Sequence, residues 1–108
     1  MAPTTIDTGQ DVATLINVFT VDQVDQQRLV DLLVEATEQV MRHRPGFVSA
    51  NIHASVDGSR VVNYAQWRSR ADFEAMLADP TAREHMGAVS DLATAEPALY
   101  EVVSTHHA

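Results

Sequence analysis

Hydrophobic and polar positions along the chain follow a strand-like period first, then a helical one, then a strand-like one again. Residues 12–21 (VATLINVFTV) are apolar on both alternating faces, which predicts a strand covered on both sides. A helix should follow, with Asp22 as its N-cap and an end before Pro45-Gly46. Its apolar stripe comprises Leu29, Leu32, Leu33, Ala36 and Val40.

A turn signal at Asp57-Gly58 separates two segments that have the two-residue period of strands. Residues 47–56 and 60–67 therefore predict a β-hairpin. One face of the first segment would carry Phe47, Ser49, Asn51, His53 and Ser55, and the other Val48, Ala50, Ile52, Ala54 and Val56.

The register of this hairpin depends on the length of its loop. A two-residue loop pairs Ile52 with Asn63 and sends His53 to the opposite face of the sheet, whereas a three-residue loop pairs His53 with Asn63. We favour the first register because it lines an apolar pocket beside Trp67. The side chains that it places there are Val48, Ala50 and Ile52.

The last third of the chain predicts two short helices and a strand. Ser69 with Asp72 three residues later resembles a capping box and opens the first helix. Asp79-Pro80 ends that helix and starts another, since Asp is a good N-cap and Pro fits the first helical position. The final strand is expected after Pro97, over residues 99–105.

The segments follow the order β, α, β, β, α, β, with the second helix in two pieces. This α+β order places all helices on one face of a four-stranded antiparallel sheet. The 108 residues are the size of one domain, so we expect a single domain over residues 12–108 after a flexible leader, residues 1–11. The other sheet face would be bare, which predicts a homodimer that buries it.

The composition excludes several classes of function. A formal net charge of −8 argues against nucleic acid and anionic membranes as partners. The chain has neither Lys nor Cys, which excludes lysine Schiff bases, thiolate nucleophiles and cysteine-ligated metals. Because the N-terminus is polar and no apolar run reaches membrane-spanning length, a cytoplasmic protein is the default prediction.

The third strand, with the sequence VVNYAQW, carries the side chains best suited to a site. Asn63, Ala65 and Trp67 share one face, so a small residue separates an amide from an indole. A flat aromatic ligand could fill the gap, with Trp67 as stacking surface and Asn63 as hydrogen-bond donor and acceptor. Spacing alone favours the other interpretation, a structural Trp with a hydrogen-bonded Asn.

The stretch from Pro45 to Trp67 (PGFVSANIHASVDGSRVVNYAQW), followed by Ser69 to Phe73 and Asp79-Pro80, resembles a known family. It is similar to the antibiotic biosynthesis monooxygenases, which are small cofactor-free, quinone-forming enzymes of aromatic polyketide pathways. The actinorhodin-type anthrone oxygenases look closest.

This resemblance implies a ferredoxin-like fold, a dimeric α+β barrel, and a pocket between the sheet and helices of each protomer. It also implies a catalytic Asn63 that hydrogen-bonds the substrate oxygen and favours its enolate, and a Trp67 that orients the ring system. The expected substrates are O₂ and a polycyclic phenol or anthrone, and no cofactor or metal is expected. The substrate-binding residues would be Phe73, Met76, Leu77 and Met86.

Two helical positions depart from the family. Its tyrosine falls at Phe73, which keeps a ring but loses the hydroxyl group. Its arginine would lie near His85 or Met86, and Arg83 is expected to point elsewhere on the helix. His85 is therefore the candidate for a catalytic proton-transfer role.

Three alternatives use the same fold. Heme-degrading monooxygenases have an Asn, a His and a Trp that could be aligned with Asn17, His85 and Met76, and the last position lacks the Trp. A polyketide cyclase would shape a poly-β-ketone in the same pocket without oxygen. A non-catalytic dimer would only bind aromatic ligands, since fold does not imply activity.

Overall fold

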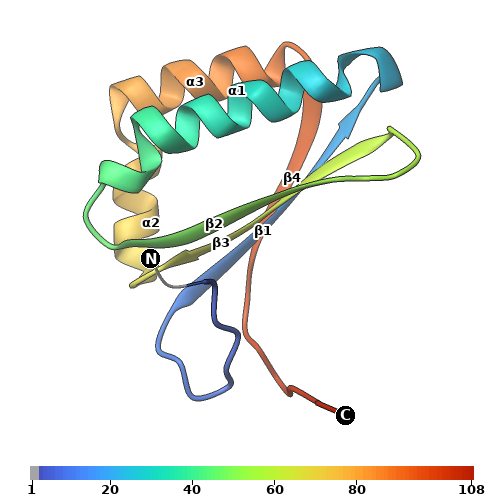
Figure 1. Ribbon diagram of the computed structural model, residues 1–108. Coiled ribbons are helices and arrows are strands. Elements are labelled where there is room, and N and C mark those ends of the chain that lie inside the picture. Colours follow the sequence, from blue (N-terminus) through green and yellow to red (C-terminus); the bar gives the residue numbers. More distant parts are fainter. Residues whose placement is uncertain (1–2) are drawn as a thin grey trace.

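Four strands form one antiparallel sheet in the order β2-β3-β1-β4 (Figure 1). The computed structural model describes residues 3–108. Its strands are β1 (Ala13–Val21), β2 (Phe47–Ala54), β3 (Arg60–Trp67) and β4 (Ala93–Tyr100). β1 occupies an inner position, which agrees with its apolar residues on both faces.

The helices all lie on one face of this sheet. α1 and α3 run side by side above the strands, and α2 stands at one end of the layer (Figure 1). They are α1 (Gln26–Gln39), α2 (Arg70–Leu77) and α3 (Pro80–Ser90), with single 3-10 turns at η1 (Gln23–Asp25) and η2 (Met41–His43). The predicted α+β class and element order are thereby confirmed. None of the helices within residues 3–108 has the length and hydrophobicity needed to cross a membrane.

Two of the three predicted helix starts are confirmed. Ser69 Oγ accepts a hydrogen bond from the Asp72 amide at 3.1 Å and opens α2. Asp79 Oδ2 accepts one from the Ala82 amide at 2.9 Å and opens α3. The third prediction was wrong, because Asp22 precedes η1 and makes no side-chain capping bond.

The final strand begins earlier than predicted. β4 contains Pro97, which pairs with Asn17 of β1. A proline normally interrupts a strand because it lacks an amide hydrogen, but it is tolerated on an edge strand when its nitrogen faces outward. Since β4 is an edge strand, the prediction that it starts after Pro97 was wrong.

The hairpin has the predicted register and starts at Phe47 as predicted, but its first residues face differently from the prediction. Ile52 pairs with Asn63 and His53 with Val62, so His53 lies on the face away from the helices. A β-bulge between Phe47 and Ser49 moves Phe47 to the helix-facing side and leaves Val48 45% exposed. The prediction that Val48 lines the pocket was therefore wrong.

Between sheet and helices the buried side chains form two clusters. The packed cluster consists of Phe19, Val21, Leu29, Val61 and Val89. The pocket cluster consists of Leu15, Val40, Ala65, Trp67, Phe73, Met76 and Ala82. Both share the same sheet, and they differ in what fills the space above it.

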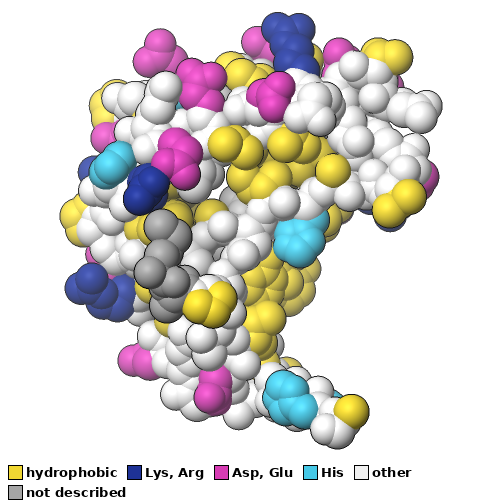
Figure 2. Space-filling view, in the orientation of Figure 1, with side chains coloured by type: hydrophobic (Ala, Val, Ile, Leu, Met, Phe, Trp, Pro, Cys, Tyr) yellow, Lys and Arg dark blue, Asp and Glu magenta, His cyan; other side chains and the backbone are white. Residues whose placement is uncertain are grey.

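The sheet face away from the helices is only partly covered. Thr4 and Thr5 lie against one end of it, where Thr4 Oγ1 contacts the Asn51 side chain at 2.9 Å and Gln66 Nε2 donates to the Thr5 carbonyl at 2.7 Å. The remainder carries mainly apolar side chains, and we call it the far face: Ile16, Val18, Val62, Tyr64 and Ala98. Figure 2 shows hydrophobic side chains along the hollowed side of the molecule.

Candidate active site

A polar row crosses the helix-facing side of the sheet between two apolar rows. The register places Asn63 of β3 directly beside Asn17 of β1, with Ile52 on one side and Pro97 on the other. The neighbouring rows contain Ala54, Val61, Phe19 and Ala95, and Ala50, Ala65, Leu15 and Leu99. Two carboxamides are thus held side by side on the two inner strands.

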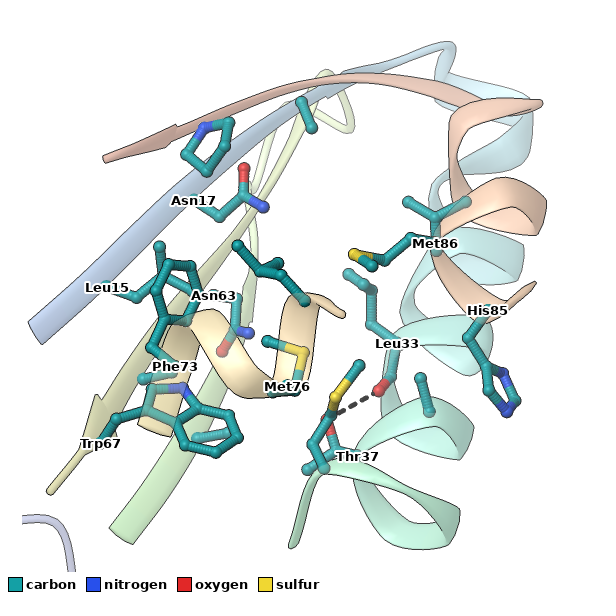
Figure 3. A pocket seen from close by; sticks show the side chains of 18 of the residues that line it. Leu15, Asn17, Leu33, Thr37, Asn63, Trp67, Phe73, Met76, His85 and Met86 are labelled. Atoms are coloured by element: carbon teal, nitrogen blue, oxygen red, sulfur yellow. Dashed lines mark hydrogen bonds between the residues drawn. The ribbon is translucent and has the colours of Figure 1, made fainter. Parts of the chain in front are cut away.

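A cavity of about 770 Å³ lies between this row and the helices (Figure 3). It has residues of all four strands and all three α-helices in its wall. Ala65 contributes only a methyl group between Asn63 and Trp67, which leaves space above the sheet at this point. The volume is in the range of sites that hold small organic molecules.

Three aromatic rings form one end of the cavity. Trp67 is 2% exposed and meets Phe47 edge to face, with ring centroids 5.5 Å apart and an interplanar angle of 88°. The ring of Phe73 in α2 also lies near Trp67, with its centroid 6.3 Å from that of the indole. The bulge in β2 supplies Phe47 to this group. Such contacts fix the indole ring rigidly beside the polar row.

Three buried polar atoms in this cavity have no hydrogen-bond partner within residues 3–108. They are Oδ1 of Asn17, Oδ1 of Asn63 and Nε1 of Trp67. An unsatisfied buried polar group costs roughly 1–3 kcal/mol, so native proteins seldom keep several together without a use. Two acceptors and one donor in an apolar cavity suit a ligand that carries hydroxyl and carbonyl oxygens on a flat carbon skeleton.

The ionisable residues of the cavity wall all lie on α2 and α3. Arg70 Nε and Glu74 Oε1 are 2.8 Å apart and form an ion pair with each other. His85 also belongs to the wall, and Figure 3 shows its ring directed away from Asn63 and Trp67. Arg83 belongs to the wall as well and is exposed.

All seven residues predicted for the site surround this cavity: Asn63, Trp67, Phe73, Met76, Leu77, His85 and Met86. The predicted site did not include Asn17, which was considered only in the alignment with heme-degrading monooxygenases. A single amide in an otherwise apolar inner strand was the available signal. Within residues 3–108 no group of three or more His, Asp or Glu side chains is placed to hold a metal ion.

Comparison with known proteins agrees with this geometry. Over residues 13–88 the chain matches the family described as antibiotic biosynthesis monooxygenase. It is 50% identical over 98 residues to the tetracenomycin-F1 monooxygenase of Streptomyces glaucescens, an alignment that covers 91% of this chain and 88% of the relative.

Two solved structures extend the likeness to three dimensions. The ActVA-Orf6 monooxygenase of Streptomyces coelicolor, in complex with nanaomycin D, superposes with a TM-score of 0.82 and 30% identity over 95% of this chain and 99% of that one. A single-residue mutant of SnoaB, a cofactor-independent oxygenase from Streptomyces nogalater, gives a TM-score of 0.80 and 26% identity, covering 89% of this chain and 97% of that one. The resemblance drawn from the hairpin motifs is confirmed, and the chain belongs to the antibiotic biosynthesis monooxygenase family.

Proposed function

We propose that this monooxygenase oxidises a polycyclic phenol or anthrone of aromatic polyketide type to a quinone, using O₂ and no cofactor. The observation that supports this most directly is the pair of unpartnered amide oxygens, of Asn17 and Asn63, inside an apolar aromatic cavity. The relatives named for tetracenomycin F1 and solved with nanaomycin D support the same class of substrate.

The reaction requires only that the substrate be made electron-rich. Loss of a proton gives an enolate or phenolate, which donates one electron to O₂. The substrate radical and superoxide then combine, forming a C–O bond to a peroxide that takes up a proton. Loss of water from this hydroperoxide breaks the O–O bond and leaves the new carbonyl, so one O₂ yields one quinone oxygen and one water.

The polar row would act on the substrate oxygen whose negative charge develops in the first step. An amide that donates to this oxygen favours the enolate over the neutral ketone, and a fixed donor in a dry cavity does so without reorganisation. The Asn17 and Asn63 carboxamides can each turn their NH₂ group toward the ligand. Trp67 would hold the ring system beside them and donate from Nε1 to a second oxygen.

The proton that the substrate loses would be accepted in the outer part of the cavity. His85 remains our candidate for the catalytic proton acceptor, although its ring is directed away from the amides. It would therefore act through water or on a substrate hydroxyl near the rim. Phe73, Met76, Leu77 and Met86 would set the width of the space that the ring system occupies.

The test is oxygen consumption by metal-free protein supplied with an anthrone or naphthacenone. We expect one O₂ consumed for each quinone formed, measured together by an oxygen electrode and by quinone absorbance, and one labelled oxygen incorporated from ¹⁸O₂. Label arriving from water instead would contradict the mechanism. Cyclised product without oxygen uptake would show a cyclase, and saturable binding without turnover would show a binding protein.

We also infer that the chain acts as a homodimer joined through the far face. The apolar side chains of Ile16, Val18 and Val62 lie on this face with no helix over them. β4 is exposed along almost all of its length. A second copy would bury both features, as a symmetric interface of identical patches does.

A further inference from the structure

Gly87 lies inside α3, where glycine is an unfavourable residue. The helix runs from Pro80 to Ser90 and its C-cap is Asp91, so Gly87 occupies neither end. A glycine within a helix lowers stability relative to alanine, because its backbone has more freedom to lose on folding. A feature of the folded protein should therefore account for it.

The two usual reasons for a glycine do not apply to Gly87. The described glycines with a positive φ are Gly46 and Gly58, so the backbone of Gly87 has a conformation that any residue adopts. A Cβ atom at this position would meet no other atom of residues 3–108 within 4 Å, its own stretch of backbone aside. No packed neighbour thus requires the absence of a side chain, and what its absence leaves is open space.

This open space lies at the rim of the cavity. Gly87 belongs to the cavity wall and is exposed, as are Arg83 and Ser90, about one helical turn before and after it. Met86 points into the cavity (Figure 3), whereas Ala88 is exposed and lies outside the wall. Gly87 is therefore a gap between two longer side chains on the cavity side of α3, and we call it the α3 notch.

The α3 notch presents carbon and not a free polar atom. The Gly87 carbonyl oxygen accepts a hydrogen bond from the Ser90 hydroxyl at 2.9 Å and another from the Asp91 amide at 3.3 Å. Both of its lone pairs are thus used, and the Cα atom is left to contact a ligand. A flat apolar ring suits such a surface, because a glycine lets the backbone and a ligand approach closely.

We propose that Gly87 is a specificity-determining residue that sets the length of the ring system the enzyme accepts. A four-ring substrate would extend from the polar row to the rim, with its last ring lying on the α3 notch. A three-ring substrate would end before the notch. This inference rests on the proposed oxygenase function and adds a limit on the size of the substrate.

The test compares Gly87→Ala with the original protein on a three-ring anthrone and a four-ring naphthacenone. The added methyl group would lift the last ring from the backbone, so KM for the naphthacenone should rise at least about tenfold. Its kcat, and both constants for the anthrone, should stay within about threefold, because the amides of the polar row are unchanged. The melting temperature should rise by about 4 °C, since alanine favours the helix.

Ala88→Gly is the matched control. It makes the reverse exchange one residue further along α3, at an exposed position outside the cavity wall. It should lower the melting temperature by a similar amount and leave KM for both substrates unchanged. Equal effects of Gly87→Ala on the two substrates, or no effect on either, would overturn the proposal.

Ligand binding separates this proposal from the oxygenase proposal. Trp67 is the single tryptophan of the chain and lines the cavity, so its fluorescence reports a quinone bound beside it. Gly87→Ala should weaken the binding of a naphthacenequinone at least about tenfold and that of an anthraquinone less than about threefold, with or without turnover. Equal changes for the two quinones would overturn the role of Gly87, whereas missing oxygen uptake would overturn the oxygenase proposal alone.

Discussion

The packed cluster and the pocket cluster lie on the same sheet face, but their side chains serve different purposes. In the packed cluster, apolar side chains pack against one another, and Leu29 is fully buried. In the pocket cluster a methyl group at Ala65 and an indole at Trp67 border a cavity of about 770 Å³. Asn17 and Asn63 mark the boundary. The contrast suggests that one half of the layer supplies stability and the other half supplies a site.

Removal of an amide from the boundary should affect rate far more than stability. Asn63→Ala should lower kcat about 100-fold, the usual loss when a fixed donor to a developing oxyanion is removed. The free energy of unfolding should change by less than about 1 kcal/mol, because Oδ1 has no protein partner to lose. Steady-state oxygen uptake and urea unfolding measure the two quantities.

Asn51→Ala is the matched control for this variant. Asn51 lies on the opposite face of the sheet, where its side chain contacts Thr4 and donates to the Tyr64 carbonyl at 3.2 Å. It should leave kcat unchanged. A rate for Asn63→Ala within about threefold of the original protein would remove the amide from the mechanism.

The packed cluster should show the opposite pattern. Leu29→Ala should lower the free energy of unfolding by about 2–5 kcal/mol, because it leaves a cavity at a fully buried position. The kcat of the remaining folded protein should stay within about twofold. Val34→Ala truncates a half-exposed side chain of the same helix and should cost less than about 1 kcal/mol. A large loss of kcat in Leu29→Ala would contradict the division between the clusters.

His85 tests how far the site extends toward solvent. If it accepts the substrate proton, turnover should rise with pH through the neutral range in which imidazoles titrate, and His85→Gln should abolish this rise. The plateau rate should fall only a few-fold, because the ring is directed away from the amides. His43→Gln is the control. A pH profile that survives in His85→Gln would assign the proton to the substrate or solvent.

The smallest effect is expected at the hairpin tip, beyond the packed cluster. Hydrogen bonds from the Ser59 hydroxyl and amide, and from the Ser55 hydroxyl, lower the pKa of Asp57 to about 2. A carboxyl whose pKa is lowered by folding stabilises the fold above the ordinary aspartate range, and this contribution disappears as the pH falls through about 2.

Asp57→Asn should therefore reduce stability slightly at neutral pH, and the difference from the original protein should shrink as the pH falls from 5 to 2. Thermal unfolding over this range measures it, and NMR titration of the Asp57 carboxyl carbon should show a midpoint near 2. Asp91→Asn removes an exposed carboxylate and serves as control. An ordinary midpoint for Asp57 would contradict the hydrogen-bond pattern.

The sequence predicted what local chemistry determines. Ser69 and Asp79 cap their helices because a side-chain oxygen at that position satisfies a free amide. The Asp57-Gly58 turn signal predicted the strand register, and with it the direction of Asn63 and His53, although the observed loop spans residues 56–59 and not two residues.

What it could not predict depends on neighbours distant in the sequence. The bulge that exposes Val48 has no marker residue, and Pro97 is acceptable within β4 only because that strand lies at an edge. Asn17 gained its place in the site from the pairing of β1 with β3, which sets it beside Asn63. The cavity itself depends on where α2 and α3 come to lie above the sheet.

The polar row also determines which molecules the cavity would bind poorly. An aromatic hydrocarbon of the same shape as the substrate would place carbon atoms against the amide oxygens of Asn17 and Asn63. These oxygens would then lose their hydrogen bonds to water without forming new ones. A site built to bind oxygen atoms rejects analogues that lack them more strongly than it resolves differences in size. Selectivity in this small enzyme would thus rest less on the contour of its apolar wall than on two amides in the middle of its sheet.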